Sequence, residues 1–139
     1  MKNNFLRVSF LTALVATAAL AQSSLELKAT IPFGFAVGNQ TLPAGEYTVT
    51  GASAASPALI IKSADQHAGG IAITNGVQAN SEERTAKLVF HRYGDRYFLA
   101  QVWPGTGSVG RQLPQSVHER ELSASVRVHP ATVLASRFR

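Results

Sequence analysis

The clearest pattern of hydrophobic and polar positions in the chain runs from residue 25 to residue 37. Every odd position in this stretch is apolar, and the even positions carry Glu, Lys, Thr, Pro, Gly and Ala in turn. Successive side chains of a β-strand point to opposite faces, so this alternation predicts a strand with one buried face. Pro32 cannot donate a backbone hydrogen bond, which predicts an edge strand or a bulge near the middle of the segment.

Shorter segments of the same kind follow and are separated by turn-forming residues. Gly38-Asn39 fits a two-residue hairpin turn with glycine at the position of positive φ, and residues 42–45 (LPAG) fit a type I turn. Further strands are predicted around residues 46–50, 58–62, 70–74, 86–93 and 96–103. Residues 75–85 and 104–110 are predicted to be loops.

A capping signal marks the start of one helix near the end of the chain. Ser116 and Glu119 have the spacing of a capping box, in which Ser116 caps the helix and the Glu119 side chain reaches back to it. The helix is predicted from Val117 to Ala124, which is so short that it needs to dock on the sheet. The whole pattern predicts an all-β fold, a small antiparallel β-sandwich or barrel of about seven strands with one short C-terminal helix.

The stretch HRYGDRYF, residues 91–98, lies between the two strongest strand candidates. Gly94-Asp95 at its centre fits a two-residue type II′ hairpin loop with glycine in the first position. This loop fixes a register in which each arginine of the stretch lies across from a tyrosine, and the two pairs lie on opposite faces.

The two pairs, Arg92 with Tyr97 and Arg96 with Tyr93, allow two interpretations. As structure, each pair stabilises the hairpin by roughly 0.2–1 kcal/mol, with cation–π contact between the side chains. As function, these four residues form a basic and aromatic hairpin tip that binds an anionic or sugar ligand, because such side chains stack on rings and contact phosphate or carboxylate groups. Arg92, Tyr93, Arg96 and Tyr97 are therefore the candidate ligand-binding residues.

The first residues have the pattern of a targeting signal. MKNNFLR carries two positive charges, VSFLTALVATAAL is an uncharged apolar run, and the ALA at 19–21 has the form of a cleavage site. The apolar run is shorter than the ~20 residues of a membrane-spanning helix. Residues 1–21 are predicted to be a cleaved signal peptide, followed by a β-rich domain at 22–124 and a last strand or flexible tail at 125–139. The expected location is periplasmic or extracellular.

Export and charge narrow the expected partners. The formal charge of +5 includes Lys2 and Arg7, so removal of residues 1–21 leaves +3. A mild excess of arginine suits an anionic polysaccharide or an envelope protein, and export argues against nucleic acid as a partner. No later segment is long and apolar enough to span a bilayer as a helix, so a transmembrane protein is not expected.

The sequence contains no established signature of catalysis or metal binding. Cysteine is absent, which excludes disulfides and thiolate metal sites. The four histidines, His67, His91, His118 and His129, lack the spacing of metal ligands, and no G-x-S-x-G motif accompanies them. Asp65 and His67 form only a weak pair in a loop. No cofactor, metal or catalytic residue is assigned.

Three stretches occur in order between Ile31 and Ala124: IPFGFAVGNQTLPAGEYTV, KLVFHRYGDRYFLAQVW and GRQLPQSVHERELS. Together they resemble a family of small secreted proteins of uncharacterised function found mainly in acidobacteria. That family has no assigned activity, substrate or cofactor. The resemblance therefore implies export and a β-rich fold, and it supplies no site residues.

Two classes of function remain open. The favoured class is a non-enzymatic exported β-domain that binds a partner or has a structural role in the cell envelope or outside the cell. The alternative is a small secreted hydrolase with a site near the 91–98 hairpin. A pocket that holds His91 or His118 beside a carboxylate favours the enzyme, whereas a closed barrel with these groups dispersed speaks against it.

Overall fold

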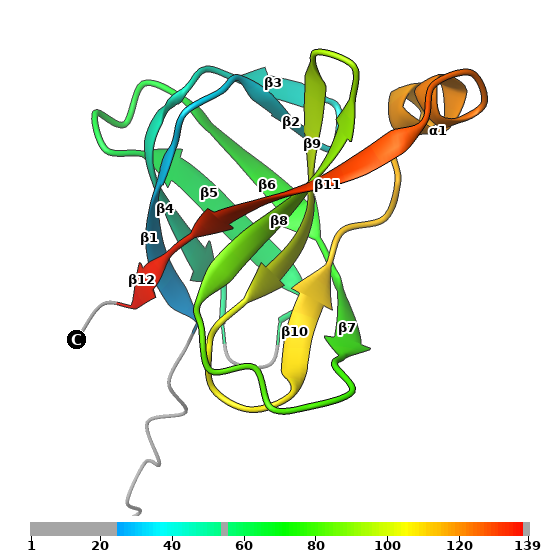
Figure 1. Cartoon of the computed structure of the whole chain (residues 1–139). Coiled ribbons are helices and arrows are strands. Elements are labelled where there is room, and N and C mark those ends of the chain that lie inside the picture. The colour runs from blue at the N-terminus through cyan, green and yellow to red at the C-terminus, as the bar shows by residue number, and fades with distance from the viewer. Residues whose placement is uncertain (1–24, 54–55, 138–139) are drawn as a thin grey trace, which may run out of the picture.

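The computed structural model describes residues 25–53 and 56–137, which form two packed β-sheets and one short helix (Figure 1). The predicted signal peptide, residues 1–21, lies outside the described residues. The all-β prediction is confirmed, and of its two alternatives the structure has the sandwich. The described ranges contain twelve strands, more than the predicted seven, because one expected strand is divided and short strands arise within expected loops.

The first sheet has five strands in the order β12-β1-β4-β5-β6, and each neighbouring pair is antiparallel. Its strands are β1 (Glu26–Ile31), β4 (Gly45–Gly51), β5 (Ala58–Ser63), β6 (Gly69–Ile73) and β12 (Ser136–Arg137).

The second sheet has seven strands, of which five follow the order β11-β8-β9-β10-β7. These are β7 (Asn75–Gln78), β8 (Lys87–Tyr93), β9 (Arg96–Trp103), β10 (Val109–Gln112) and β11 (Val128–Leu134). The other two, β2 (Phe35–Val37) and β3 (Gln40–Leu42), form a hairpin that joins the sheet where β2 runs parallel to β9.

The strand expected at residues 25–37 divides into β1 and β2, which belong to different sheets. The alternation of buried and exposed side chains holds within each part. Pro32 lies in the interruption and has no backbone N–H for a ladder, so the chain leaves the first sheet there. The predicted bulge is thus a complete break, and it places Phe33 between the two sheets at the end where the hairpin β8–β9 turns.

The turns around β3 differ in how well the sequence predicts them. Gly38 has a φ of +58° and, with Asn39, joins β2 to β3 as predicted. At residues 42–45, where a type I turn is predicted, the structure has a bend at Ala44. The Tyr47 hydroxyl donates to the Pro43 carbonyl oxygen at 2.5 Å, and this side-chain bond fixes the bend.

Three other segments form strands, although the sequence predicts loops for two of them and either a strand or a flexible tail for the third. β7 and β10 arise in the expected loops 75–85 and 104–110 and pair with each other at an edge of the second sheet. The segment after residue 125 forms β11 and β12, which pair with β8 and β1. Backbone pairing with a neighbour creates these strands, so the alternation of side chains marks them only weakly.

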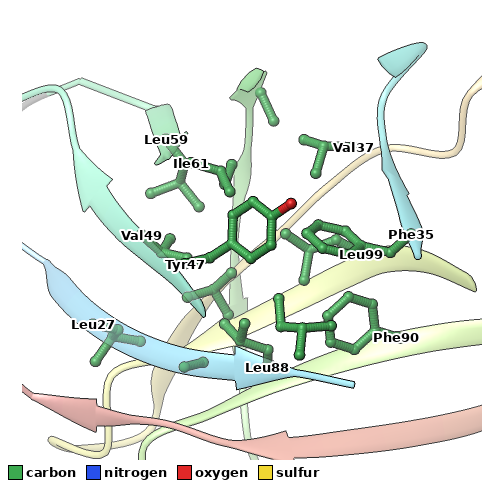
Figure 2. Close-up of a cluster of buried hydrophobic side chains, with 14 of the residues drawn as sticks. Leu27, Phe35, Val37, Tyr47, Val49, Leu59, Ile61, Leu88, Phe90 and Leu99 are labelled. Atoms are coloured by element: carbon green, nitrogen blue, oxygen red, sulfur yellow. The ribbon is translucent and has the colours of Figure 1, made fainter. Parts of the chain in front are cut away.

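The core lies between the sheets and is built from the inward positions of both (Figure 2). The ring of Phe35 packs edge-to-face on Tyr47 at 5.0 Å and on Phe90 at 5.4 Å between ring centroids. Aliphatic side chains surround these rings, including Leu27, Val37, Val49, Leu59, Ile61, Leu88 and Leu99. This core holds β2 and the β8–β9 hairpin in fixed positions, and the candidate site lies at their common end.

Candidate binding site

The β8–β9 hairpin has the register that its sequence predicts. Both Arg–Tyr pairs lie directly across the two strands, Tyr93 with Arg96 and Arg92 with Tyr97. Gly94 has a φ of +60° and Asp95 a negative φ, which agrees with a type II′ loop, because a type I′ loop needs positive φ at both residues. The hairpin therefore presents one Arg–Tyr pair on each face.

The inward face of the hairpin tip carries Arg92 and Tyr97. The Tyr97 ring stacks on Phe33 at 3.7 Å between centroids, and Phe33 contacts the core residue Phe90 edge-to-face at 4.9 Å. The Arg92 guanidinium lies over the Tyr97 ring at 5.7 Å, and its Nε donates to the Gly94 carbonyl oxygen at 2.8 Å. Arg92 is therefore engaged within the hairpin itself.

The helix α1 (Val117–Ser123) contacts the outward side chains of the hairpin strand β8 through Glu119. The helix begins where predicted, and the backbone N–H of Glu119 donates to Ser116 Oγ at 3.1 Å. The prediction that the Glu119 side chain reaches back to Ser116 is wrong. That carboxylate turns toward the sheet and is only 5% exposed. Two hydrogen-bond donors on β8 hold it there, which favours burial over an exposed capping bond.

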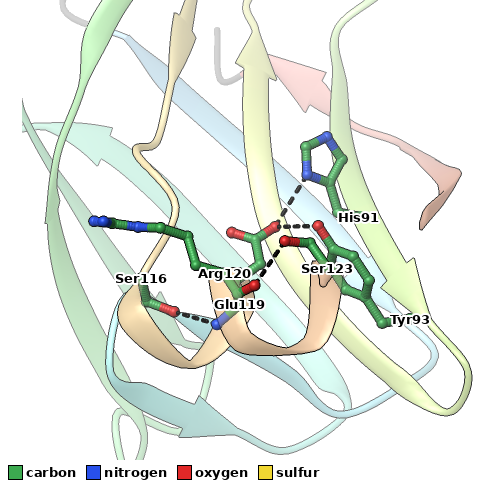
Figure 3. Close-up of polar contacts among 6 residues, drawn as sticks. All are labelled: His91, Tyr93, Ser116, Glu119, Arg120 and Ser123. Carbon is green, nitrogen blue, oxygen red and sulfur yellow. Dashed lines mark hydrogen bonds and ion pairs between the residues drawn. The ribbon is translucent and has the colours of Figure 1, made fainter. Parts of the chain in front are cut away.

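Glu119 connects the helix to β8 through one carboxylate oxygen (Figure 3). Its Oε1 lies 3.0 Å from His91 Nδ1 and 3.3 Å from the Tyr93 hydroxyl, which donates to it. Burial and the neighbouring Glu119 charge raise the pKa of Tyr93 above its ordinary value. The Tyr93 ring also packs edge-to-face on Phe98 at 5.7 Å. The helix is thus docked by a polar contact and an aromatic cluster together.

A pocket of about 460 Å³ opens beside this helix at the hairpin tip. Its walls come from four segments of the chain: the start of β2, β3, the β8–β9 turn with β9, and α1. The lining residues are Gly34, Phe35, Ala36, Thr41, Asp95, Arg96, Tyr97, Phe98 and His118. Arg96 Nη1 contacts His118 Nε2 at the pocket, where the strand and the helix meet. An imidazole, a guanidinium, a carboxylate and a hydroxyl therefore belong to residues that line this pocket.

The structure divides the four candidate residues between two roles. Arg96 and Tyr97 line the pocket, whereas Arg92 and Tyr93 do not. Tyr93 is buried and bonds to Glu119, and Arg92 bonds within the hairpin. The ligand-binding role of these four residues stays a prediction, and the structure places only Arg96 and Tyr97 of them at a pocket.

The pocket also holds residues that the sequence analysis did not assign to a site: Thr41, Asp95 and His118. His118 is 22 positions from Arg96 along the chain. The capping signal predicts that a helix begins at this point, but it does not predict where the helix docks. No spacing in the sequence reports a contact that depends on such docking, so only the tertiary structure reveals it.

The pair Asp65 and His67 lies in a different part of the molecule, in the loop between β5 and β6. Asp65 Oδ1 accepts hydrogen bonds from Ser63 Oγ at 2.5 Å and from the backbone N–H of His67 at 3.1 Å. These bonds, that from Ser63 first, lower the pKa of the Asp65 carboxyl. The arrangement is a hydrogen-bonded turn in which the carboxylate shapes the loop.

Within residues 25–53 and 56–137, no three or more His, Asp or Glu side chains gather in a way that suits a metal ion. In the same ranges, no helix has the length and apolar character needed to cross a membrane. No protein-family model, no curated protein and no solved structure matches the chain.

Proposed function

We propose that the protein is an exported, non-enzymatic binding domain of the cell envelope or exterior, and that the pocket beside α1 binds an acidic sugar unit of a polysaccharide. The observation that carries this proposal is the pairing of Arg96 and His118 at the mouth of a pocket of about 460 Å³. Small-molecule sites in proteins commonly have volumes of roughly 300–1,000 Å³, so this pocket is large enough for a sugar unit.

The other lining residues suit the remaining parts of such a ligand. A guanidinium binds a carboxylate through charge-assisted hydrogen bonds, and Arg96 supplies these donors. Asp95 and Thr41, which line the pocket, offer oxygen acceptors for sugar hydroxyls. A ligand with both an acidic group and hydroxyls uses all of these groups.

The expected location agrees with this ligand. The signal-like residues 1–21 predict export to the cell envelope or exterior, where this proposal places the polysaccharide. The resemblance to a family of small secreted acidobacterial proteins supports the same location. Nucleic acid, in contrast, is a partner that an exported domain seldom meets.

The test is binding of trigalacturonate, a linear trimer of an acidic sugar, measured by isothermal titration calorimetry at low salt. The matched comparison ligand is maltotriose, a neutral trimer. We expect trigalacturonate to bind and Arg96→Gln to weaken it by roughly ten- to hundredfold, because a hydrogen bond to a charged group contributes about 1.5–3 kcal/mol.

The control variant is Arg84→Gln, because the Arg84 side chain is 86% exposed, pairs with Glu82 and does not line the pocket. It removes the same charge and is expected to bind like the wild type. Equal binding of both trimers, or equal effects of the two arginine variants, would contradict an acidic-sugar site at this pocket.

A secreted hydrolase is the second candidate function, and two observations favour it: His118 and the carboxylate of Asp95 line the same pocket, and His91 lies beside a buried carboxylate. His91 Nδ1 lies 3.0 Å from the buried carboxylate of Glu119, which is how a general base is oriented in many hydrolases. Among the hydrogen bonds of the described residues, none joins His91 to a serine or threonine hydroxyl that such a base could activate. This arrangement therefore supports the binding proposal better than a hydrolase.

Turnover of p-nitrophenyl esters and glycosides separates the two candidates. The wild type and His91→Gln are compared at equal concentration, and the binding proposal expects the same background release from both. Turnover by the wild type that is lost in His91→Gln would establish the hydrolase and displace the binding proposal.

A further inference from the structure

The contact between Arg96 and His118 constrains the protonation of the imidazole. Arg96 Nη1 faces His118 Nε2 directly. A guanidinium has only donors, so the hydrogen bond requires a lone pair on Nε2 and a proton on Nδ1. On the other side of the ring, His118 Nδ1 lies 4.0 Å from Glu121 Oε2, where that proton faces a carboxylate. The ligand-free pocket is thus arranged for a neutral His118.

Protonation of His118 changes this contact from attraction to repulsion. The second proton occupies Nε2, so two cationic groups then face each other with donors only. Their mutual repulsion is relieved when an oxyanion lies between them and accepts a hydrogen bond from each. The same two side chains therefore have a ligand-free state with a neutral imidazole and a ligand-bound state with a charged one.

We infer that the pocket takes up a proton on His118 when it binds the oxyanion of its ligand, so that Arg96 and His118 together capture a carboxylate, sulfate or phosphate group most tightly under mildly acidic conditions. This inference rests on the proposed function, since it concerns the same pocket and the acidic group of the same ligand. Linkage requires that a proton which is taken up on binding also strengthens binding as the pH falls.

The charged groups around His118 agree with such a change. Two carboxylates belong to this surrounding: Asp95 lines the same pocket, and Glu121 Oε2 lies 4.0 Å from His118 Nδ1. Glu119, the next residue on the helix, points its carboxylate at His91 and Tyr93 instead. Arg96 is the cation in contact with the ring, and the oxyanion neutralises it in the bound state. The side chain of His118 is 55% exposed, so protons reach it from solvent.

Binding of trigalacturonate at two pH values tests the inference, because its carboxylates stay ionised at both. Calorimetry at about pH 5.5 and about pH 8, in buffers with different ionisation enthalpies, gives the affinity and the number of protons taken up. We expect binding to be at least about tenfold tighter at the lower pH, which by linkage corresponds to net proton uptake on binding between the two pH values.

Three variants assign the effect to this pair. His118→Gln keeps a hydrogen-bonding group without the titration, so its binding is expected to be independent of pH and to take up no proton. His67→Gln is the control, because His67 lies in the separate β5–β6 loop and does not line the pocket. This variant is expected to keep the pH dependence of the wild type. Arg96→Gln is expected to weaken binding at both pH values.

The possible results separate this inference from the proposed function. Binding that needs Arg96 but is equally tight at both pH values, without proton uptake, would overturn the inference and leave the proposed function intact. The absence of trigalacturonate binding at either pH would overturn the proposed function. A pH dependence that persists in His118→Gln would also overturn the inference, because another group would then be the one that titrates.

Discussion

The carboxylate of Glu119, on α1, lies 3.0 Å from Nδ1 of His91, on β8, and joins the only helix of the described chain to the second sheet. The same oxygen accepts a hydrogen bond from the buried hydroxyl of Tyr93. The helix is too short to be stable alone, so this contact has consequences for stability and for the pocket that α1 helps to form.

Replacement of Glu119 by alanine is expected to lower the free energy of unfolding by about 1–3 kcal/mol, because it leaves the buried Tyr93 hydroxyl without its acceptor. Urea denaturation followed by the fluorescence of Trp103, the single tryptophan and only 6% exposed, measures this change. The control is Glu121→Ala on the same helix, where the side chain is 71% exposed and the expected effect is within about 0.5 kcal/mol. Equal stability of the two variants would show that the buried contact has no special role.

Replacement of Gly94 by valine is expected to destabilise the protein by roughly 1–2 kcal/mol, because its φ of +60° is unfavourable for an L-residue and most of all for a β-branched one. A Cβ at this position meets nothing within 4 Å, so the loss comes from the backbone alone. Gly76→Val is the control, because its Cβ also meets nothing and its φ is not in the left-handed region. A thermal melt that shows the same Tm for both variants would contradict the type II′ loop.

Arg92 and Arg96 are expected to respond oppositely to replacement by alanine. Arg92→Ala removes the cation–π contact with Tyr97 and the bond to the Gly94 carbonyl, which lowers stability by about 0.5–1.5 kcal/mol and leaves trigalacturonate binding unchanged. Arg96→Ala weakens binding and changes stability little. Calorimetry and urea denaturation on both variants measure the two effects. Loss of binding in Arg92→Ala at unchanged stability would show that Arg92 is a ligand-binding residue.

The raised pKa of Tyr93 predicts a loss of stability in alkali. Burial is the first cause of the shift and the Glu119 charge the second. The folded pKa exceeds the ordinary value of 10.0, so this contribution is complete below pH 10.0 and is lost as the pH rises through the folded pKa. Tyr93→Phe is therefore expected to show a shallower decline in the free energy of unfolding than the wild type when denaturation is repeated above pH 10.0. Parallel curves would mean that Tyr93 ionises equally in both states.

Local structure was predictable where the side chains of neighbouring residues determine it. The β8–β9 register follows from Gly94-Asp95, since a two-residue loop fixes which residues face each other. The start of α1 follows from Ser116, whose hydroxyl caps the helix. In both cases, residues close together in the sequence determine the outcome.

Other parts were not predictable, because partners distant in the sequence decide them. β7 has the composition of a loop, yet it is a strand because β10 supplies its hydrogen bonds. Glu119 has the spacing of a capping box, yet its carboxylate turns inward because His91 and Tyr93 lie beneath it. Where a buried partner is available, it outweighs the exposed local bond that the spacing suggests.

The sequence by itself determined the all-β class, the paired arginines and tyrosines of the hairpin, and the place where the helix begins, because neighbouring residues specify each of these. Only the tertiary structure decided that α1 docks on the outward face of that hairpin and brings His118 to Arg96. This docking depends on contacts across 22 or more positions, from His118 to Arg96 and from Glu119 to β8. Such contacts form only when the packed sheets hold both segments in place, and so the composition of HRYGDRYF alone did not separate the residues of a pocket from those of a turn.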